Sequence, residues 1–192
     1  MNKPQLLLHI CCAPDEAWGI TVLQEKYDLL CFFCNPNIAP LEEYSLRLNE
    51  ALKVAKHFNV PFEADEYQPE SWKDAIAPYI KTPEGGERCR ACFLLRLKRT
   101  AKFCAEKEIS EFTTVMSVSP HKNITMLNET GHIAADQFSV NYLETNLKKN
   151  DGFKKSIHLS NSLCLYRQDY CGCSLSKTER DIRVTLRKKS PD

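Results

Sequence analysis

The chain has 192 residues, of which 43% are hydrophobic and 27% are charged, and its formal net charge at pH 7 is +1. These values are ordinary for a globular protein, and residues 1–192 are expected to form a single domain with a sizeable core. Residues 1–16 contain only a short apolar run before a proline and two acidic residues, which is not typical of a secretory signal. Because a membrane span needs roughly 20 apolar residues, we expect a cytoplasmic protein that does not use a membrane.

Short apolar segments alternate with helical patterns along the first part of the chain. The segments predicted as buried strands are rich in β-favouring residues and comprise 5–10, 28–34, 61–64 and 111–118. The segments predicted as helices are 16–26, 40–58, 70–80 and 87–108. This alternation indicates βαβ units. The predicted fold class is therefore α/β, with a mostly parallel sheet flanked by helices, similar to Rossmann-like and nucleotide alpha-hydrolase-like folds.

The regular alternation fades after Val118. We therefore predict that residues 1–118 form the sheet core and that residues 119–192 form a helical and loop subdomain, whose helical C-terminal portion covers the metal site described below. In parallel sheets the reactive groups lie beyond the carboxyl ends of the strands. The residues that follow each predicted strand are thus the first candidates for a functional site.

The chain contains ten cysteines, and clustered thiols in a reducing compartment more often bind metal or do redox work than form disulfides. Cys11 and Cys12 follow the first predicted strand. Adjacent cysteines are too close for a relaxed disulfide, so two metal atoms or two corners of one cluster suit them better. A pair of small buried hydrophobic residues is the alternative. Asp15, close by, is a candidate oxygen ligand or proton donor.

Two further cysteine pairs have spacings that suit a metal site. Cys89 and Cys92 form a C-x₂-C motif at the start of a predicted helix, which places both thiols on one face, and the helix N-terminus favours thiolates. Cys171 and Cys173 flank a glycine, so they can bind one metal or form a strained, easily reduced disulfide.

These six thiols exceed the four that a structural zinc takes, and the surplus favours an iron–sulfur centre with redox function. The remaining four cysteines lie in apolar surroundings or on predicted elements and are interpreted as core residues: Cys31, Cys34, Cys104 and Cys164.

Several polar residues lie where a substrate site is expected. Asn35 and Asn37 follow the second predicted strand, and Tyr44 and Arg47 lie on the next predicted helix. Capping or surface roles are the alternatives for these residues. Residues 117–123 lie at the end of the fourth predicted strand and just beyond it, and can cap a helix or bind an anion through backbone N–H groups.

Basic residues gather near the C-terminus. Residues 146–192 contain eleven Lys or Arg and five Asp or Glu, although the whole chain is nearly neutral. This distribution is explained either by a polyanionic partner or by a solvated, lysine-rich helix.

Five runs of the sequence closely resemble, in the same order, those of the cobalamin-independent epoxyqueuosine reductases, the QueH family. They span residues 6–177 and read HICCAPDE, CNPNIAPLEEYSLR, RCRACFLLRL, TTVMSVSPHKN and YRQDYCGCSLS. The resemblance implies the last step of queuosine biosynthesis, in which the epoxide of epoxyqueuosine at the tRNA wobble position is reduced to an alkene.

The resemblance also implies a 4Fe-4S cluster, with the family's ligands falling on four residues: Cys11, Cys12, Cys89 and Cys92. The family's C-x-C pair falls on Cys171 and Cys173, and has been viewed either as a redox-active disulfide or as ligands to an additional mononuclear iron. Many members resemble CCAPC in the first motif, where this chain has Asp15. A carboxylate ligand to the second iron is therefore expected here rather than a thiol.

A tRNA substrate adds expectations about binding. An anticodon base that splays out can stack on aromatic side chains, so Tyr166, Arg167 and Tyr170 are predicted to contact it. The basic tail is predicted to hold phosphates through Lys177, Arg180, Arg183, Arg187, Lys188 and Lys189. Electrons would come from an external donor. The competing interpretation is a zinc-stabilised, non-enzymatic RNA-binding module; an ATP-using enzyme is disfavoured because no Gly-rich phosphate loop is present.

Overall fold

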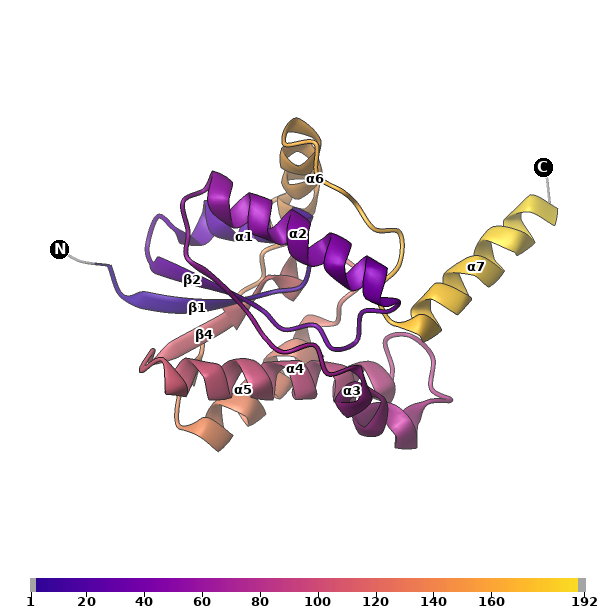
Figure 1. The fold of residues 1–192 in the computed structure, drawn as a ribbon, viewed down its shortest axis with the longest axis horizontal. Coiled ribbons are helices and arrows are strands. Elements are labelled where there is room, and N and C mark those ends of the chain that lie inside the picture. Colours follow the sequence, from indigo (N-terminus) through magenta and orange to yellow (C-terminus); the bar gives the residue numbers. More distant parts are fainter. Residues whose placement is uncertain (1–2, 190–192) are drawn as a thin grey trace.

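A single parallel sheet organises the molecule, in a computed structural model that describes residues 3–189 and the side chains up to residue 187 (Figure 1). The strand order is β3-β2-β1-β4-β5, and every neighbouring pair is parallel. The strands are β1 (Gln5–Ile10), β2 (Asp28–Phe33), β3 (Phe62–Ala64), β4 (Glu111–Thr114) and β5 (Asn141–Tyr142). The predicted α/β class with a mostly parallel sheet is confirmed.

Helices cover both faces of this sheet. The helices are α1 (Ala13–Leu23), α2 (Leu41–His57), α3 (Pro69–Ile76), α4 (Glu87–Glu106), α5 (Ile124–Phe138), α6 (Gly152–Ser162) and α7 (Ser174–Lys189), with short 3₁₀ segments η1 (Ala77–Tyr79) and η2 (Val115–Val118). Figure 1 shows α1 and α2 on one side of the sheet and α4 and α5 on the other.

Four of the six residues of the central strand β1 are large apolar side chains, and they lie on both of its faces. Leu6, Leu8 and Ile10 belong to the core under α1 and α2, whereas Leu7 belongs to the core under α4 and α5. All four side chains are fully buried. Because both faces of a parallel sheet are covered, its strands read as continuous hydrophobic runs rather than as alternating ones.

The fourth strand is shorter than predicted. Residues 111–118 were expected to be one strand, but β4 ends at Thr114 and η2 follows. The hydroxyl oxygen of Thr114 accepts a hydrogen bond from the backbone N–H of Met116 at 3.1 Å, and this cap starts the 3₁₀ turn. The prediction of a strand up to Val118 was therefore wrong in its second half, where apolar residues are buried in a turn instead.

The sheet also extends further along the chain than expected. β5 has only two residues, too few for a pattern of alternation, and lies beyond the expected end of the sheet at Val118. Tyr142 on β5 packs in the same core as Leu127 and Ala134 on α5. Residues up to Tyr142 thus complete the sheet layers.

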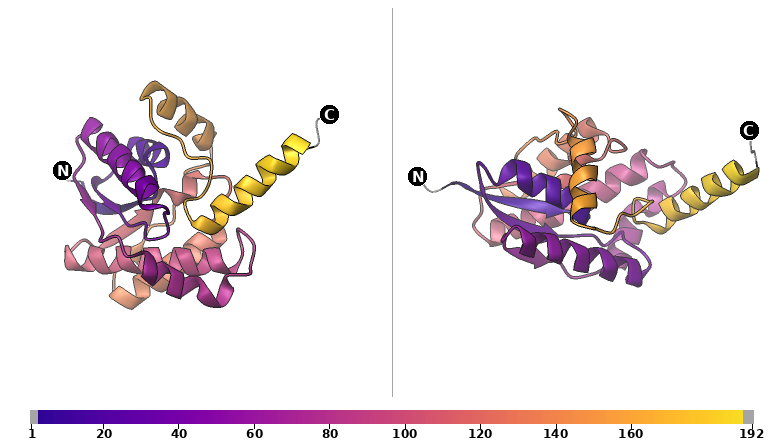
Figure 2. Two further views of the ribbon diagram at one scale, coloured as in Figure 1. Left: turned by 45° about the vertical axis from the view of Figure 1, so that its right-hand side comes forward. Right: turned by 90° about the horizontal axis from the view of Figure 1, so that it is seen from above.

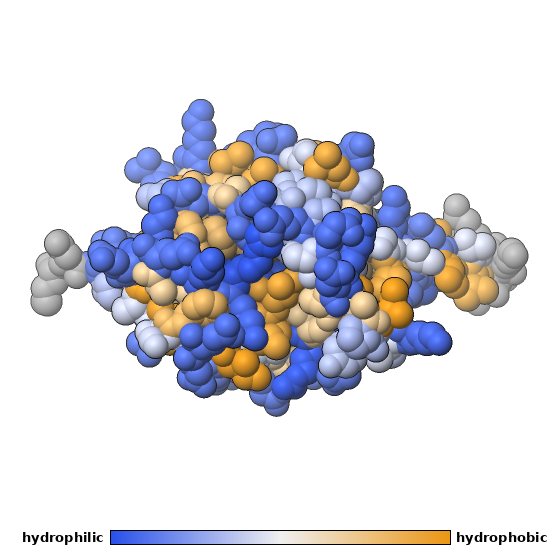
Figure 3. Space-filling view, turned by 60° about the horizontal axis from the view of Figure 1, so that its bottom comes forward, coloured by the Kyte–Doolittle hydropathy of each residue, from blue (hydrophilic) through white to orange (hydrophobic). Residues whose placement is uncertain are grey.

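The C-terminal helix α7 leaves the body of the molecule, as both views of Figure 2 show. Among the described residues, no helix is long and apolar enough to cross a membrane. The face in Figure 3 is mostly hydrophilic, with small separate apolar patches of the kind that ordinary protein surfaces carry.

The strand order places a natural site at one edge of the sheet. From β1 the chain proceeds to β2 and β3 on one side, and β4 and β5 lie on the other. Such a reversal opens a crevice at the carboxyl ends of the two strands that flank it, here β1 and β4. The first cysteine pair follows β1, and η2 follows β4.

Candidate metal centre

Cys11, Cys12 and Asp15 form a compact group at the end of β1. Their ligand atoms all lie within 4.8 Å of one another. The Cys11 thiol lies 3.8 Å from Cys12 Sγ and 3.6 Å from Asp15 Oδ2. Cys12 caps the N-terminus of α1, and Asp15 stands in the first turn of that helix. The positive end of the helix dipole therefore faces this group and favours anionic sulfur.

Burial and mutual hydrogen bonding separate the proton affinities of these three side chains. The hydrogen bond from Cys11 lowers the pKa of Cys12 to about 6, while the same bond and burial raise the pKa of Cys11. Burial also raises the pKa of Asp15. The group thus combines one readily formed thiolate with a carboxyl that keeps its proton to a higher pH than a free aspartate does.

The other two cysteine pairs meet in a small pocket beside α4. Cys89 and Cys92 line it from α4, and Cys171 and Cys173 line it from the segment before α7. Backbone N–H groups already point at two of these sulfurs: Gly85 N lies 3.2 Å from Cys89 Sγ, and Ser176 N lies 3.4 Å from Cys173 Sγ. Hydrogen bonds of this kind stabilise thiolates and tune clusters that thiolates hold.

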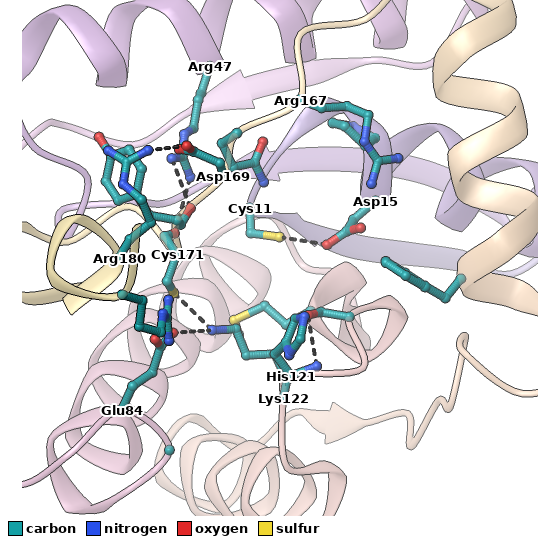
Figure 4. Close-up of a pocket in the computed structure, with 18 of the residues that line it drawn as sticks. Cys11, Asp15, Arg47, Glu84, His121, Lys122, Arg167, Asp169, Cys171 and Arg180 are labelled. Carbon is teal, nitrogen blue, oxygen red and sulfur yellow. Dashed lines mark hydrogen bonds and ion pairs between the residues drawn. The ribbon is translucent and has the colours of Figure 1, made fainter. Parts of the chain in front are cut away.

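Cys171 connects the two groups, because it also lines a second, larger cavity of about 800 Å³ together with Cys11 and Asp15. Figure 4 shows Cys11 and Asp15 directed toward one another, with Cys171 and Lys122 at the facing wall. Five of the six thiols, from three distant segments, therefore line two cavities that share Cys171, and the sixth thiol, Cys12, lies 3.8 Å from Cys11 Sγ. This donor set fits an iron–sulfur cluster, since such clusters are held by cysteine thiolates. The roles of individual cysteines as ligands stay predictions.

Two cations face the thiols, the buried Arg96 and the half-buried Lys122, and the sequence patterns did not predict either of them. Arg96 is 2% exposed and donates to Cys34 O at 3.2 Å and to Asn35 Oδ1 at 2.5 Å, and no described carboxylate pairs with it. Lys122 Nζ lies 2.8 Å from Cys171 Sγ. Although burial disfavours its charge, the neighbouring Cys171 raises the pKa of Lys122. Two fixed positive charges thus offset the negative charge that thiolates bring into this region.

A signal for Arg96 was present in the sequence. It lies four residues after Cys92 on α4 and seven after Cys89, so helical spacing places the three on one face. Lys122 lies in the segment 117–123, for which the sequence predicts helix capping or anion binding through backbone N–H groups, and that prediction does not involve its side chain.

Arg47 holds the C-x-C segment in place. It is 2% exposed, and its guanidinium donates to Cys171 O at 3.1 Å and to Tyr170 O at 3.3 Å. Its Nε donates to Glu43 Oε1 at 2.7 Å, and its Cζ lies 5.1 Å from the centre of the Tyr170 ring. Arg47 lines the large cavity, but its guanidinium already bonds to the Glu43 carboxylate and to two backbone carbonyls, and its role as a substrate residue stays a prediction.

Some of the predicted substrate residues line a cavity and others do not. Arg167 and Tyr170 line the large cavity, and Asn37 lines the small pocket. Tyr166 donates to the Glu43 carboxylate at 3.1 Å, which fastens its segment to α2. Tyr166, Asn35 and Tyr44 line neither cavity. Asn35 donates to Ile10 O, and the Tyr44 ring packs against the Tyr67 ring at an interplanar angle of 34°.

Of the four cysteines interpreted as core residues, three are buried and one is exposed. Cys31, Cys34 and Cys104 are fully buried. Cys164 is exposed, so its interpretation as a core residue was wrong. It stands just after the end of α6 with a φ of 51°, and in this left-handed turn Leu163 and Leu165 pack against the core while the Cys164 side chain stays at the surface.

Fold and site together define a class of protein: a parallel α/β domain with a thiol-rich candidate metal centre at the carboxyl edge of its sheet and a basic cavity beside it. The family model described as "Epoxyqueuosine reductase QueH" matches residues 6–179, and this chain belongs to that family. The resemblance found in the sequence motifs is thereby confirmed.

Relatives described as "Epoxyqueuosine reductase QueH" are similar over nearly the whole chain. The protein from Thermotoga maritima is 36% identical, covering 91% of this chain and 91% of the relative. The protein from Acinetobacter baylyi is 35% identical over 93% and 84%, and that from Streptococcus pyogenes is 32% identical over 97% and 76%.

Solved structures share the fold at low sequence identity. The U34-tRNA thiolase NcsA from Methanococcus maripaludis, described with its [4Fe-4S] cluster, has a TM-score of 0.55 and 14% identity, covering 100% of this chain and 69% of that one. The predicted subunit of a tRNA methyltransferase from Methanocaldococcus jannaschii also has a TM-score of 0.55, with 12% identity, covering 81% and 74%. These likenesses establish the fold alone.

Proposed function

We propose that the protein is an epoxyqueuosine reductase that converts epoxyqueuosine at the wobble position of tRNA to queuosine. The reaction adds two electrons and two protons to the epoxide, leaving an alkene and one water. The observation that carries this proposal is the position of Cys171, which lines both the pocket of Cys89, Cys92 and Cys173 and the cavity of Cys11 and Asp15. Redox-capable thiols thus adjoin a cavity of substrate size.

In this proposal a 4Fe-4S cluster is held by Cys11, Cys12, Cys89 and Cys92. When bound, the cluster supplies electrons one at a time, passed on from an external donor. The donor set supports this assignment, because the low pKa of Cys12 and the buried charge of Arg96 both favour thiolates here.

Two roles remain for the group formed by Cys171, Cys173 and Asp15. If the protein binds an additional mononuclear iron, the two thiolates and the carboxylate would be its ligands. If it does not, the two thiols would be oxidised to a disulfide and reduced again in each cycle, and Asp15 would donate a proton from its carboxyl to the epoxide oxygen. The raised pKa of Asp15 supports proton donation. Iron counting separates the two: about four irons per chain support the disulfide, and about five support the second metal.

The large cavity suits a modified nucleotide. Its volume of about 800 Å³ lies within the roughly 300–1,000 Å³ of ligand pockets. The exposed Arg167 guanidinium on its wall offers a stacking surface for a base that has left the anticodon loop, whereas the Tyr170 ring already lies against Arg47 and Arg180. Lys122, fixed 2.8 Å from Cys171 Sγ, holds a positive charge where the epoxide oxygen would leave.

We also propose that the chain works as one domain in the cytoplasm. The cores on both faces of the sheet include residues from the first and last thirds of the chain, which supports one folding unit. Ten cysteines without a disulfide suit a reducing compartment.

The direct test is turnover by anaerobically purified protein loaded with iron and sulfide. With a chemical reductant and tRNA that carries epoxyqueuosine, nucleoside mass spectrometry should detect queuosine formed in proportion to enzyme and time. Preparations loaded with zinc instead of iron serve as the control, since zinc is redox-silent. Colourless, zinc-containing protein that binds RNA and never forms queuosine would instead establish the RNA-binding module.

A further inference from the structure

Helix α7 presents three arginines on one face. Arg180, Arg183, Val184 and Arg187 all line the large cavity, and their spacing of three, four and seven residues places them on one side of a helix. From Arg180 to Arg187 the helix rises by about 10 Å. Since α7 leaves the body of the molecule (Figure 2), this face leads from the cavity wall toward solvent.

The first of these arginines is held by the protein, whereas the other two are free. Arg180 pairs with Asp169, its Nε lies 2.7 Å from Asp181 Oδ1, and its guanidinium lies 5.5 Å from the centre of the Tyr170 ring. Arg183 and Arg187 are exposed, and among the described residues neither has an ion pair or a side-chain hydrogen bond. Their charge is therefore available to a ligand.

The opposite side of α7 sets the direction in which this face points. Leu175 packs against Trp72, Ile76 and Cys92, and Glu179 accepts from Arg88 Nη2 at 2.5 Å. These contacts anchor the first turns of the helix beside the thiol-rich pocket. The arginine face is thus aimed at the cavity by packing within the molecule.

Charge at the cavity indicates the chemistry of the ligand. Seven Lys or Arg line it against three Asp or Glu, and two of these three acids already face Arg180 and Lys122. A small neutral substrate would fit inside the cavity and would not need arginines on the part of α7 that leads toward solvent. A polyanion with one unit inside and its backbone leaving along α7 would need cations at the positions of Arg183 and Arg187.

We propose that Arg183 and Arg187 bind the phosphates of the RNA strand next to the nucleotide in the cavity, so that α7 guides the strand into the site. This inference rests on the proposed function for the identity of the nucleotide. In this arrangement the two arginines bind the phosphate backbone of the RNA and position the strand, while the cavity selects the base.

The experiment is a binding titration of a fluorescein-labelled anticodon stem–loop RNA, followed by anisotropy at several salt concentrations. Three double variants are compared with the wild type: R183A/R187A, the charge-keeping R183K/R187K, and the control K26A/K56A. Lys26 and Lys56 are exposed and lie just before β2 and β3, at the opposite edge of the sheet, so the control removes the same charge elsewhere. Alanine favours helix, so α7 should stay folded.

For R183A/R187A we expect Kd to rise roughly tenfold and the slope of log K against log salt to fall by about 1.4, because each single-strand phosphate contact contributes roughly 0.7. R183K/R187K should retain most of the affinity, and K26A/K56A should bind like the wild type. In turnover of tRNA that carries epoxyqueuosine, the loss in R183A/R187A should fall mainly on KM. Unchanged binding by R183A/R187A, or an equal loss in K26A/K56A, would overturn the proposal.

The same measurements separate this inference from the proposed function. Wild-type protein that forms queuosine, with R183A/R187A binding RNA normally, leaves the function standing and removes the role of α7. Wild-type protein that forms no queuosine but loses RNA affinity in R183A/R187A leaves α7 as an RNA surface and removes the assigned reaction.

Discussion

Three segments supply the thiols of the candidate centre, and the structure holds two of them, residues 11–12 and residues 171–173, in different ways. Cys11 and Cys12 continue directly from β1, which is fully buried over most of its length and paired with β2 and β4. Residues 165–173 form neither helix nor strand, and side chains of α2 attach them to the body. The first region is positioned by the core itself, while the second depends on a few hydrogen bonds. Its geometry can therefore be lost without unfolding the protein.

The largest effect should come from the region held by the core. Cys12→Ser should remove a cluster ligand, so the iron and sulfide content per chain should fall. Turnover should drop more than about 100-fold, because losing a ligand costs more than losing a residue that only hydrogen-bonds to a ligand. Cys104→Ser is the matched control, because Cys104 is equally buried but donates to Ile109 O away from the site. Normal iron content in Cys12→Ser, measured by metal analysis and visible absorption, would contradict the assignment.

The next effect tests how the second region is attached. Arg47→Met removes the donors to Cys171 O and Tyr170 O, so the C-x-C segment should loosen and turnover should fall by roughly 10- to 100-fold through lost positioning. Limited proteolysis should cut the segment after α6 faster than in the wild type. Arg90→Met, which removes only an exposed ion pair with Glu129, should leave both measurements near wild type. Equal proteolysis of the two variants would argue against the role of Arg47.

A comparison of two glycines tests the shape of the C-x-C segment, which contains Gly172 but not Gly85. Gly172 has a φ of 129°, and a Cβ there would stand 3.0 Å from Ile38 Cγ1 and 3.1 Å from Arg47 Nη1. Gly172→Ala should cost about 1–3 kcal/mol and lower Tm by at least about 2 °C. Gly85 has a φ of 88° but open space around it, so Gly85→Ala should cost less. Calorimetry that finds the two variants equally stable would show that the close approach at Gly172 does not matter.

The pH dependence of stability tests the region around Cys11 and Cys12, which the core holds in place. Glu16 is fully buried beside the site, neither carboxylate oxygen has a hydrogen-bond partner among residues 3–187, and burial raises its pKa. A raised pKa means that its contribution to stability is present below the unfolded value of 4.5 and is lost as pH rises through the folded value. Glu16→Gln should therefore stabilise the metal-free protein at pH 8, by roughly 1–3 kcal/mol, and have little effect near pH 4.

Denaturant unfolding at the two pH values measures this difference. Asp136→Asn, which changes an exposed carboxylate on α5, is the control and should show no such pH dependence. Equal effects of Glu16→Gln at both pH values would mean that this carboxyl is charged in the folded protein or equally buried when unfolded.

Much of the fold followed from local pattern. The apolar run of β1 and the helical spacing of α2 and α4 were enough to place these elements and to indicate a parallel sheet. The two-residue β5 and the turn after Thr114 were missed, because short segments carry too few residues for a period to be seen and because a side-chain cap overrides β propensity.

The sequence by itself determined which thiols are grouped in pairs and that they follow strands or begin helices, since spacing and periodicity are properties of the local chain. Only the tertiary structure decided that Cys171 lines both cavities, that Arg96 is buried beside the thiols and that Arg183 and Arg187 line the large cavity. Such relations join residues separated by many positions in the chain. They depend on how helices and loops pack on the sheet, and no local period encodes that packing.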